Sequence, residues 1–142
     1  MYFQLERIER ILKELQKYIY SQEVSLDIYR VKECDYNSYE LLKEEGKDWN
    51  IFKRGDRWGG KDKHFWFKTQ IVIPENFEGK TVVYKVSTGR EDQWDALNPQ
   101  FFIYVDKTLM QGLDINHREI ILSENAKVGK KYDIDLYAYA GW

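Results

Sequence analysis

The sequence predicts an all-β fold, a jelly-roll-like antiparallel β-sandwich with an N-terminal α-helix. Aromatic residues make up 16% of the 142 residues, which favours strands over a helical bundle. Several short runs alternate apolar and polar side chains, and glycine- or proline-containing turns separate them. The one long stretch with helical spacing precedes all of these runs. Together these observations indicate a single β-sandwich domain with one helix at its start.

The first segment, residues 1–22, carries a helical apolar stripe. Its members recur three or four positions apart: Leu5, Ile8, Leu12, Leu15 and Ile19. The opposite face mixes acidic and basic side chains, whereas a helix that lies on a membrane surface is mainly basic there. We therefore expect residues 1–22 to pack on the sandwich or on a following domain. A docking or oligomerisation helix is the alternative.

Residues 23–142 are expected to form the sandwich. The strand-like runs are 24–31, 64–73, 81–88, 101–105, 108–110, 120–122 and 132–138. Residues 34–42 are ambiguous and are consistent with a short helical turn. Asp106-Lys107 is expected to close a hairpin, and Pro74 and Gly129 mark turns between strands.

The segment Trp49–Lys63 combines tryptophan with glycine and contains Trp58. An exposed indole beside flexible backbone suits a surface on which a sugar ring packs. The alternative is that Trp49 and Trp58 plug the core beneath a long loop. We favour this alternative, because large aromatic side chains are usually mostly buried. Trp94, in the acidic loop 89–97, is a third tryptophan of interest for sugar binding.

A polar cluster between two strand-like runs is the best functional candidate. It comprises Gln111, Asp114, Asn116, His117 and Arg118. So many polar groups need partners from the fold or from a ligand. A satisfied polar corner of the sandwich is the competing interpretation, and residue chemistry alone favours it. With Trp49, Trp58 and His64, these residues are candidates for contact with carbohydrate or with another domain.

No catalytic constellation stands out. A retaining glycosidase needs two carboxyl groups about 5–5.5 Å apart, and the sequence spacing singles out no such pair. His64 and His117 are the only histidines, whereas a zinc site uses three or four His, Cys or carboxylate ligands. We expect no catalytic residue, no metal and no other cofactor in this chain.

Composition limits the partners and the compartment. The net charge of −2 and the pI of about 5.8 argue against nucleic acid. No apolar stretch is long enough to cross a membrane, and no signal peptide is recognisable. The single cysteine, Cys34, has acidic neighbours that should raise its thiol pKa. A chain with one cysteine predicts a reducing, cytoplasmic location.

Several motifs resemble one known family. The segments NPQFFIYVD (98–106) and QGLDINHRE (111–119) resemble the N-terminal domain of glycoside hydrolase family 38 α-mannosidases, in the branch of bacterial and cytosolic-type enzymes. Further matching motifs are WGG (58–60), HFWF (64–67) and AYAG (138–141), so the resemblance covers roughly 46–141. The family often has glycine where this chain has Lys107.

The resemblance implies that this chain is an excised, non-catalytic β-sandwich domain. Family members are several times longer, and their zinc and carboxylate nucleophile lie in a catalytic domain downstream. The implied partners are that catalytic domain and, in the longer enzyme, an α-mannoside or glycan. Supporting domain assembly, oligomerisation or the rim of the sugar site is then the expected role. An autonomous carbohydrate-binding module and a protein-interaction domain that forms a homo-oligomer are the alternatives.

Overall fold

The computed structural model describes residues 22–87, 99–113 and 118–140. Eight strands and two short 3₁₀ helices follow one another in these ranges: β1 (Ile28–Cys34), η1 (Tyr39–Lys43), β2 (Asn50–Lys53), β3 (His64–Val72), η2 (Glu75–Phe77), β4 (Val82–Lys85), β5 (Gln100–Val105), β6 (Thr108–Leu113), β7 (Glu119–Ser123) and β8 (Lys131–Tyr139). The described residues are therefore all-β, as predicted. The expected helix over residues 1–22 falls almost entirely outside them and stays a prediction.

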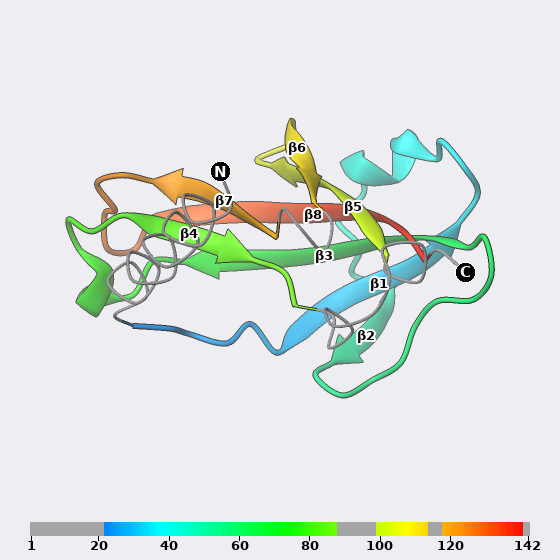
Figure 1. Ribbon diagram of the computed structural model, residues 1–142, viewed down its shortest axis with the longest axis horizontal. Coiled ribbons are helices and arrows are strands. Elements are labelled where there is room, and N and C mark those ends of the chain that lie inside the picture. The colour runs from blue at the N-terminus through cyan, green and yellow to red at the C-terminus, as the bar shows by residue number, and fades with distance from the viewer. Residues whose placement is uncertain (1–21, 88–98, 114–117, 141–142) are drawn as a thin grey trace, which may run out of the picture.

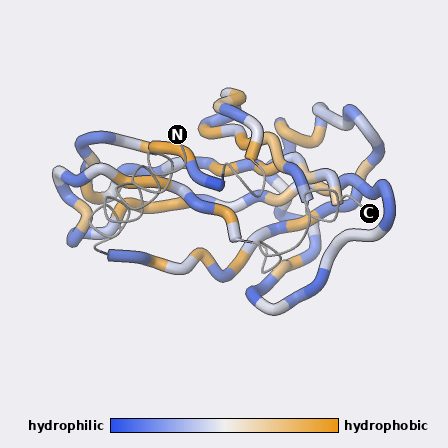
Figure 2. The backbone as a smooth tube through the Cα atoms, in the orientation of Figure 1, coloured by the Kyte–Doolittle hydropathy of each residue, from blue (hydrophilic) through white to orange (hydrophobic). Residues whose placement is uncertain are grey.

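The strands form two antiparallel sheets. Six strands in the order β2-β1-β3-β8-β5-β6 make the large sheet, and β4 and β7 make the small one. The long strands β3 and β8 run along the middle of the large sheet, with β1–β2 on one side and β5–β6 on the other (Figure 1). Apolar segments follow the strands, and many of the connecting turns are hydrophilic (Figure 2).

The main core lies between the two sheets. Alternate residues of β3, Phe65, Phe67 and Ile71, point into it, as the period-two pattern predicted. Tyr84 of β4 and Ile120 of β7 meet them from the small sheet. Burying these side chains removes apolar surface from water, at about 25 cal/mol per Å².

A second, smaller core covers the outer face of the large sheet. η1 and the segment that follows it fold back over this face, where Leu41 and Trp49 pack over Trp66, Tyr104 and Tyr137. Both faces of β3 are consequently covered where Phe65–Lys68 are buried in succession. The sequence pattern indicated which side chains alternate, but not that the second face is also buried.

Three local expectations need correction. The first strand begins at Ile28 rather than at residue 24, and 22–27 is irregular. β2 lies inside the segment that we expected to be a loop, because its residues complete the edge of the large sheet beside β1. The strand at 108–110 continues to Leu113, with a bulge in its pairing opposite Ile103/Tyr104.

Candidate functional site at the loop end of the sandwich

Several strand termini meet at one end of the sandwich, which we call the loop end. In the large sheet, His64 at the start of β3 pairs with Tyr139 at the end of β8. Tyr139 in turn pairs with Gln100 at the start of β5. The end of β6 is also here, because Leu113 pairs with Phe101. Pairing register thus brings together residues from four distant parts of the sequence.

The small sheet contacts the large one beside the segment 114–117. The amide of Val86, just after β4, donates to the carbonyl oxygen of Arg118, just before β7, over 2.8 Å. The side chain of Gln111 spans the gap between the sheets, since its Nε2 donates to the carbonyl oxygen of Glu119 at 2.9 Å. Gln111, before the segment 114–117, therefore links the large sheet to the small one. Arg118, after that segment, is bonded to the residue that follows β4. Gln111 has a partner within the fold, as the competing polar-corner interpretation requires.

The rest of the polar cluster lies outside the described residues. These positions are Asp114, Asn116 and His117, and their roles stay predictions. Leu113 before them is buried, and Arg118 after them is half-buried, so the fold fixes where the segment leaves and re-enters. The loop with Trp94 is likewise undescribed; it lies between β4 and β5 in the sequence, and Gln100 at the start of β5 is at the loop end. Connections at one end of a rigid sandwich are a common location for binding residues.

Trp58 plugs the core at the loop end. Its indole is half-buried and packs edge-on against Phe65 and Phe67 at centroid distances of 5.3 and 5.0 Å, and it also contacts Phe101. The two glycines after it have φ angles of 113° and 130°, which side chains rarely adopt. A Cβ on Gly60 would lie 2.7 Å from Cδ of Lys63. This backbone path returns the chain to the core, so Trp58 packs as the core-plug interpretation predicts.

Trp49 lies elsewhere, over the outer face of the large sheet. Only 4% of it is exposed, and its Nε1 donates to Glu44 at 3.0 Å. Its ring covers the ammonium group of Lys68, 5.1 Å from the ring centroid. An indole enclosed in this way has no free face for a sugar ring. The core-plug interpretation is therefore confirmed for Trp49.

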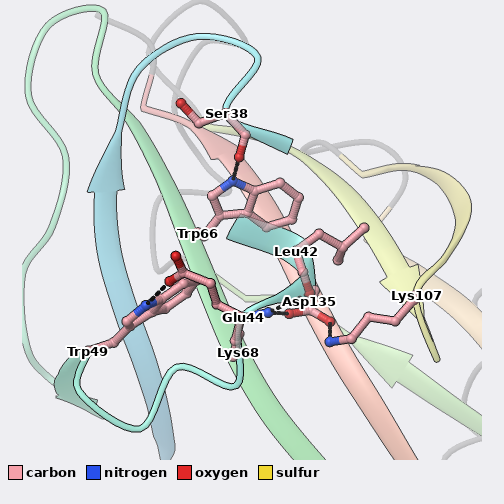
Figure 3. A network of polar contacts seen from close by, with 8 residues as sticks. All are labelled: Ser38, Leu42, Glu44, Trp49, Trp66, Lys68, Lys107 and Asp135. Carbon is pink, nitrogen blue, oxygen red and sulfur yellow. Dashed lines mark hydrogen bonds and ion pairs between the residues drawn. The ribbon is translucent and has the colours of Figure 1, made fainter. Parts of the chain in front are cut away.

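A buried charge cluster lies beneath Trp49 (Figure 3). Lys68 Nζ contacts Asp135 Oδ1 at 2.5 Å and donates to the carbonyl oxygen of Leu42 at 3.0 Å. Lys107 Nζ reaches the other carboxylate oxygen of Asp135 at 2.9 Å. Burial lowers the pKa of Lys68, the contact with Asp135 opposes that shift, and the charge of Lys107 adds to it. Every buried polar side-chain atom among the described residues has a partner, so this cluster is satisfied.

His64 belongs to a row of polar aromatic groups that extends from the loop end. Its Nδ1 is 2.9 Å from the hydroxyl of Tyr137, and its ring contacts those of Tyr36 and Tyr139 at 5.6 and 5.2 Å. The hydroxyl of Tyr139 donates to Asp62. Sequence reasoning identified His64 but missed Tyr36, Asp62 and both C-terminal tyrosines. The alternating Tyr137-Ala138-Tyr139 was the available signal, but its partners become apparent only from the register.

The sole cysteine has no sign of activation. Burial, followed by the charges of Asp35, Glu40 and Glu33, raises the pKa of Cys34 to about 11, and Lys32 opposes this only in part. The predicted direction of the shift is confirmed. At neutral pH the thiolate fraction is consequently very small, and the thiolate is the nucleophilic form.

Metal-binding groups and membrane-spanning helices are both absent from the described residues. These residues contain no group of three or more His, Cys, Asp or Glu side chains that could hold a metal ion. His64 therefore belongs to no group among them with the three or four ligands that a zinc site uses. No helix within these ranges is long and apolar enough to cross a membrane.

One known family matches most of the chain. The family described as "Alpha-mannosidase, jelly roll domain" matches residues 21–141. The chain belongs to this family. The jelly-roll class predicted from the sequence is thereby confirmed, as is the relation to α-mannosidases. No curated protein matches the sequence.

Solved structures of low identity share the fold of this α-mannosidase jelly-roll domain. One is the β-glucuronidase from Ruminococcus gnavus in complex with D-glucuronic acid, with a TM-score of 0.54 and 11% identity. Another is the same protein with C6-substituted uronic isofagomine, with a TM-score of 0.55 and 12% identity. In both cases the match covers 82% of this chain and 21% of the other. The chain therefore spans about a fifth of the length of these proteins, and the likeness is one of fold.

Proposed function

We propose that this chain is the non-catalytic N-terminal domain of a longer, zinc-dependent retaining α-mannosidase, and that its loop end faces the catalytic domain. The zinc and the catalytic carboxylates belong to that domain, which hydrolyses α-mannosidic linkages. The proposed location is the cytoplasm, consistent with one unpaired cysteine. The bacterial and cytosolic-type branch is the branch that we propose for the longer enzyme.

The observation that carries this proposal is the family match over 21–141, combined with the gathering of strand termini at the loop end. The segment 114–117 leaves one rigid strand and enters another, and both flanks are tied to the sheets. Loops carried on such a scaffold often hold the residues that contact a neighbouring domain or a ligand. Asp114, Asn116 and His117 would then contact the junction or the rim of the sugar site.

A carbohydrate-binding module is the second candidate. Trp49 gives it no support, since that indole is enclosed, and Trp58 packs mainly inward. What favours it is the exposed ring of Tyr36 beside His64, which in turn contacts the half-exposed ring of Tyr139. The two candidates are compatible, because an accessory domain at the rim of a sugar site can also bind sugar.

The first test compares activity in two proteins. The 142-residue chain and the longer polypeptide that continues its reading frame are assayed on a chromogenic α-mannoside with added divalent metal. We expect activity only in the longer protein. Activity in the short chain would contradict a non-catalytic role, and activity in neither would contradict the assignment to an α-mannosidase.

The role of the loop end is then tested in the longer protein with Asp114→Ala/His117→Ala. We expect kcat/KM or the melting temperature to fall, because these side chains would lose their contacts with the catalytic domain. The matched control is Glu124→Ala/Lys131→Ala, which removes two exposed charges at the opposite end of the sandwich. If both double variants match the unchanged enzyme, the loop end is not the junction.

A further inference from the structure

The outer face of the small sheet exposes apolar side chains. Tyr84 of β4 and Ile120 of β7 point into the main core. Because side chains alternate along a strand, Val83 and Ile121 point away from it. These two residues are paired directly across the sheet; Ile121 is 54% exposed, and Val83 is half-buried. One face of an antiparallel sheet often meets water, so this exposure does not by itself require a partner.

The same chain contains a segment that needs an apolar surface. Residues 1–21, the N-terminal segment, precede the first described residue, and their apolar side chains recur at helical spacing with charged ones on the other face. A helix of this length is only marginally stable alone in water, and most helical stability comes from packing an apolar face. The stripe therefore favours a position against exposed apolar side chains.

Hydrogen bonds fix where the N-terminal segment joins the sandwich. The side-chain oxygen of Gln22 accepts from Asn76 at 3.1 Å and from Lys80 at 3.4 Å. Lys80 lies two residues before β4, so the segment ends beside the start of the small sheet. In a helix, Leu5 to Ile19 span about 21 Å, at about 1.5 Å per residue. β7, the longer strand of the small sheet, has 5 residues and spans about 17 Å. The stripe is consequently long enough to cross the whole small sheet.

The outer face of the large sheet is the competing surface. η1 and the segment after it already cover part of this face. Val72 is exposed on it, but its neighbours there are Gln70 and Asp133, which are hydrogen-bonded to each other at 3.1 Å. An apolar helix face over this pair would remove a carboxylate from water, which is costly. On the small sheet, the outward charges of Lys85 and Glu119 lie opposite each other at the end of β4, and long side chains can lie beside a helix with their charges in water.

We propose that the N-terminal segment is an amphipathic helix that lies on the outer face of the small sheet, with its stripe over Val83 and Ile121. The domain then has three layers, which are the helix, the small sheet and the large sheet. A two-stranded sheet alone is marginally stable in water, and packing against a helix stabilises it from its second side. The family match begins at residue 21, so this proposal does not depend on the proposed function.

Amide NMR on the isotope-labelled 142-residue chain tests the position of the helix. Leu12→Gln/Leu15→Gln places two polar groups in the stripe, and the control, Arg10→Gln/Lys17→Gln, places them on the charged face. Leucine, arginine, lysine and glutamine have similar helix propensities, so neither pair changes that contribution. We expect the stripe variant, but not the control, to shift the amides of β4 and β7. We also expect urea denaturation to show a folding equilibrium constant lowered at least about tenfold in the stripe variant only.

Reciprocal variants change the two candidate surfaces. Ile121→Gln should shift the amides of residues 5–19, whereas Val72→Gln, at a similarly exposed strand position on the large sheet, should leave them unchanged. Both positions are exposed, so the sandwich should fold in both variants. Each spectrum is recorded at two protein concentrations, because a second copy could supply the helix instead.

Three results would overturn the proposal. If the stripe variant shifts the amides around Val72 instead, the helix lies on the large sheet. If neither the stripe variant nor Ile121→Gln shifts amides across the contact, the N-terminal segment does not pack on the sandwich. If the shifts disappear on dilution, the helix comes from a second copy. None of these results bears on the activity of the longer protein, so they leave the accessory-domain proposal unaffected.

Discussion

At the scale of single residues, Lys68 and Asp135 of the buried charge cluster show how the fold tolerates buried charge. Asp135 is 1% exposed, and each of its carboxylate oxygens has a lysine partner. Lys68 adds a carbonyl acceptor and the face of Trp49. Desolvating such charges costs several kcal/mol, and only a full set of partners offsets that cost. The cluster is therefore sensitive to the loss of any one member.

Lys68→Met should lower the free energy of unfolding by about 3 kcal/mol, because Asp135 would stay buried with Lys107 as its only cation. Urea denaturation followed by tryptophan fluorescence measures this. Lys127→Met is the matched control, since Lys127 pairs with Glu78 at 3.9 Å on the surface. Surface pairs contribute about 0–1 kcal/mol. Equal effects of the two substitutions would show that the buried ion pair contributes no more to the free energy of unfolding than the surface pair does.

At the scale of an element, the β5–β6 hairpin shows how a turn and the core support each other. Asp106 and Lys107 both have positive φ, 49° and 68°, as a type I′ turn requires. Glycine adopts a positive φ without strain, whereas lysine at the second of these positions costs backbone strain. Here the side chain of Lys107 contacts Asp135, and this contact offsets part of the backbone strain. Asp106 Oδ1 in turn accepts from the amide of Asp133 at 2.9 Å.

Asp106→Ala should destabilise the chain by about 1 kcal/mol or more, because the Asp133 amide loses its acceptor and alanine disfavours positive φ. Asp106→Asn retains a carbonyl oxygen and tolerates this backbone conformation. We therefore expect it to stay within about 0.5 kcal/mol of the unchanged chain in urea denaturation. If the two variants are equally stable, the side-chain contact with β8 contributes nothing.

At the scale of the whole molecule, one hydrogen bond joins the two sheets through the core. The hydroxyl of Tyr29 on β1 lies 2.6 Å from that of Tyr84 on β4. Burial is the main cause that raises the pKa of Tyr84 well above 10.0, and burial also raises that of Tyr29. Their neutral forms are therefore favoured in the folded state relative to the unfolded chain.

Because the folded pKa values are raised, the stability that they contribute is present below the unfolded value of about 10. It is lost as the pH rises from that value through the folded ones. We expect the free energy of unfolding to fall above about pH 10, as measured by urea denaturation between pH 8 and 11. In Tyr29→Phe/Tyr84→Phe this fall should be smaller. An unchanged pH profile in the double variant would assign the fall to other groups.

At pH 8, Tyr84→Phe alone should destabilise the chain by about 1 kcal/mol, because the half-buried Tyr29 hydroxyl would lose its partner. The double variant should be more stable than the sum of the single effects predicts, as a double-mutant cycle measures. Additive effects would show that the two hydroxyls act independently.

The amount that could be predicted from the sequence differs between the fold and the candidate site. The strand predicted at 64–73, which the structure has at His64–Val72, follows from side chains that alternate with a period of two, a local property. β2 was missed because Asn50–Lys53 is short, and only β1 beside it makes it a strand. His64 was selected for its chemistry, but its partners are 28 residues before it, at Tyr36, and 75 after it, at Tyr139.

The sequence by itself determined the all-β class, the hairpin at Asp106 and the family, because periodicity, turn chemistry and motifs are local properties of the chain. Tertiary structure decided which tryptophans are enclosed, which lysines share Asp135 and which segments meet at the loop end. Those outcomes depend on the order and register of strands far apart in sequence. A one-residue change of register would reverse the face of every side chain on a strand.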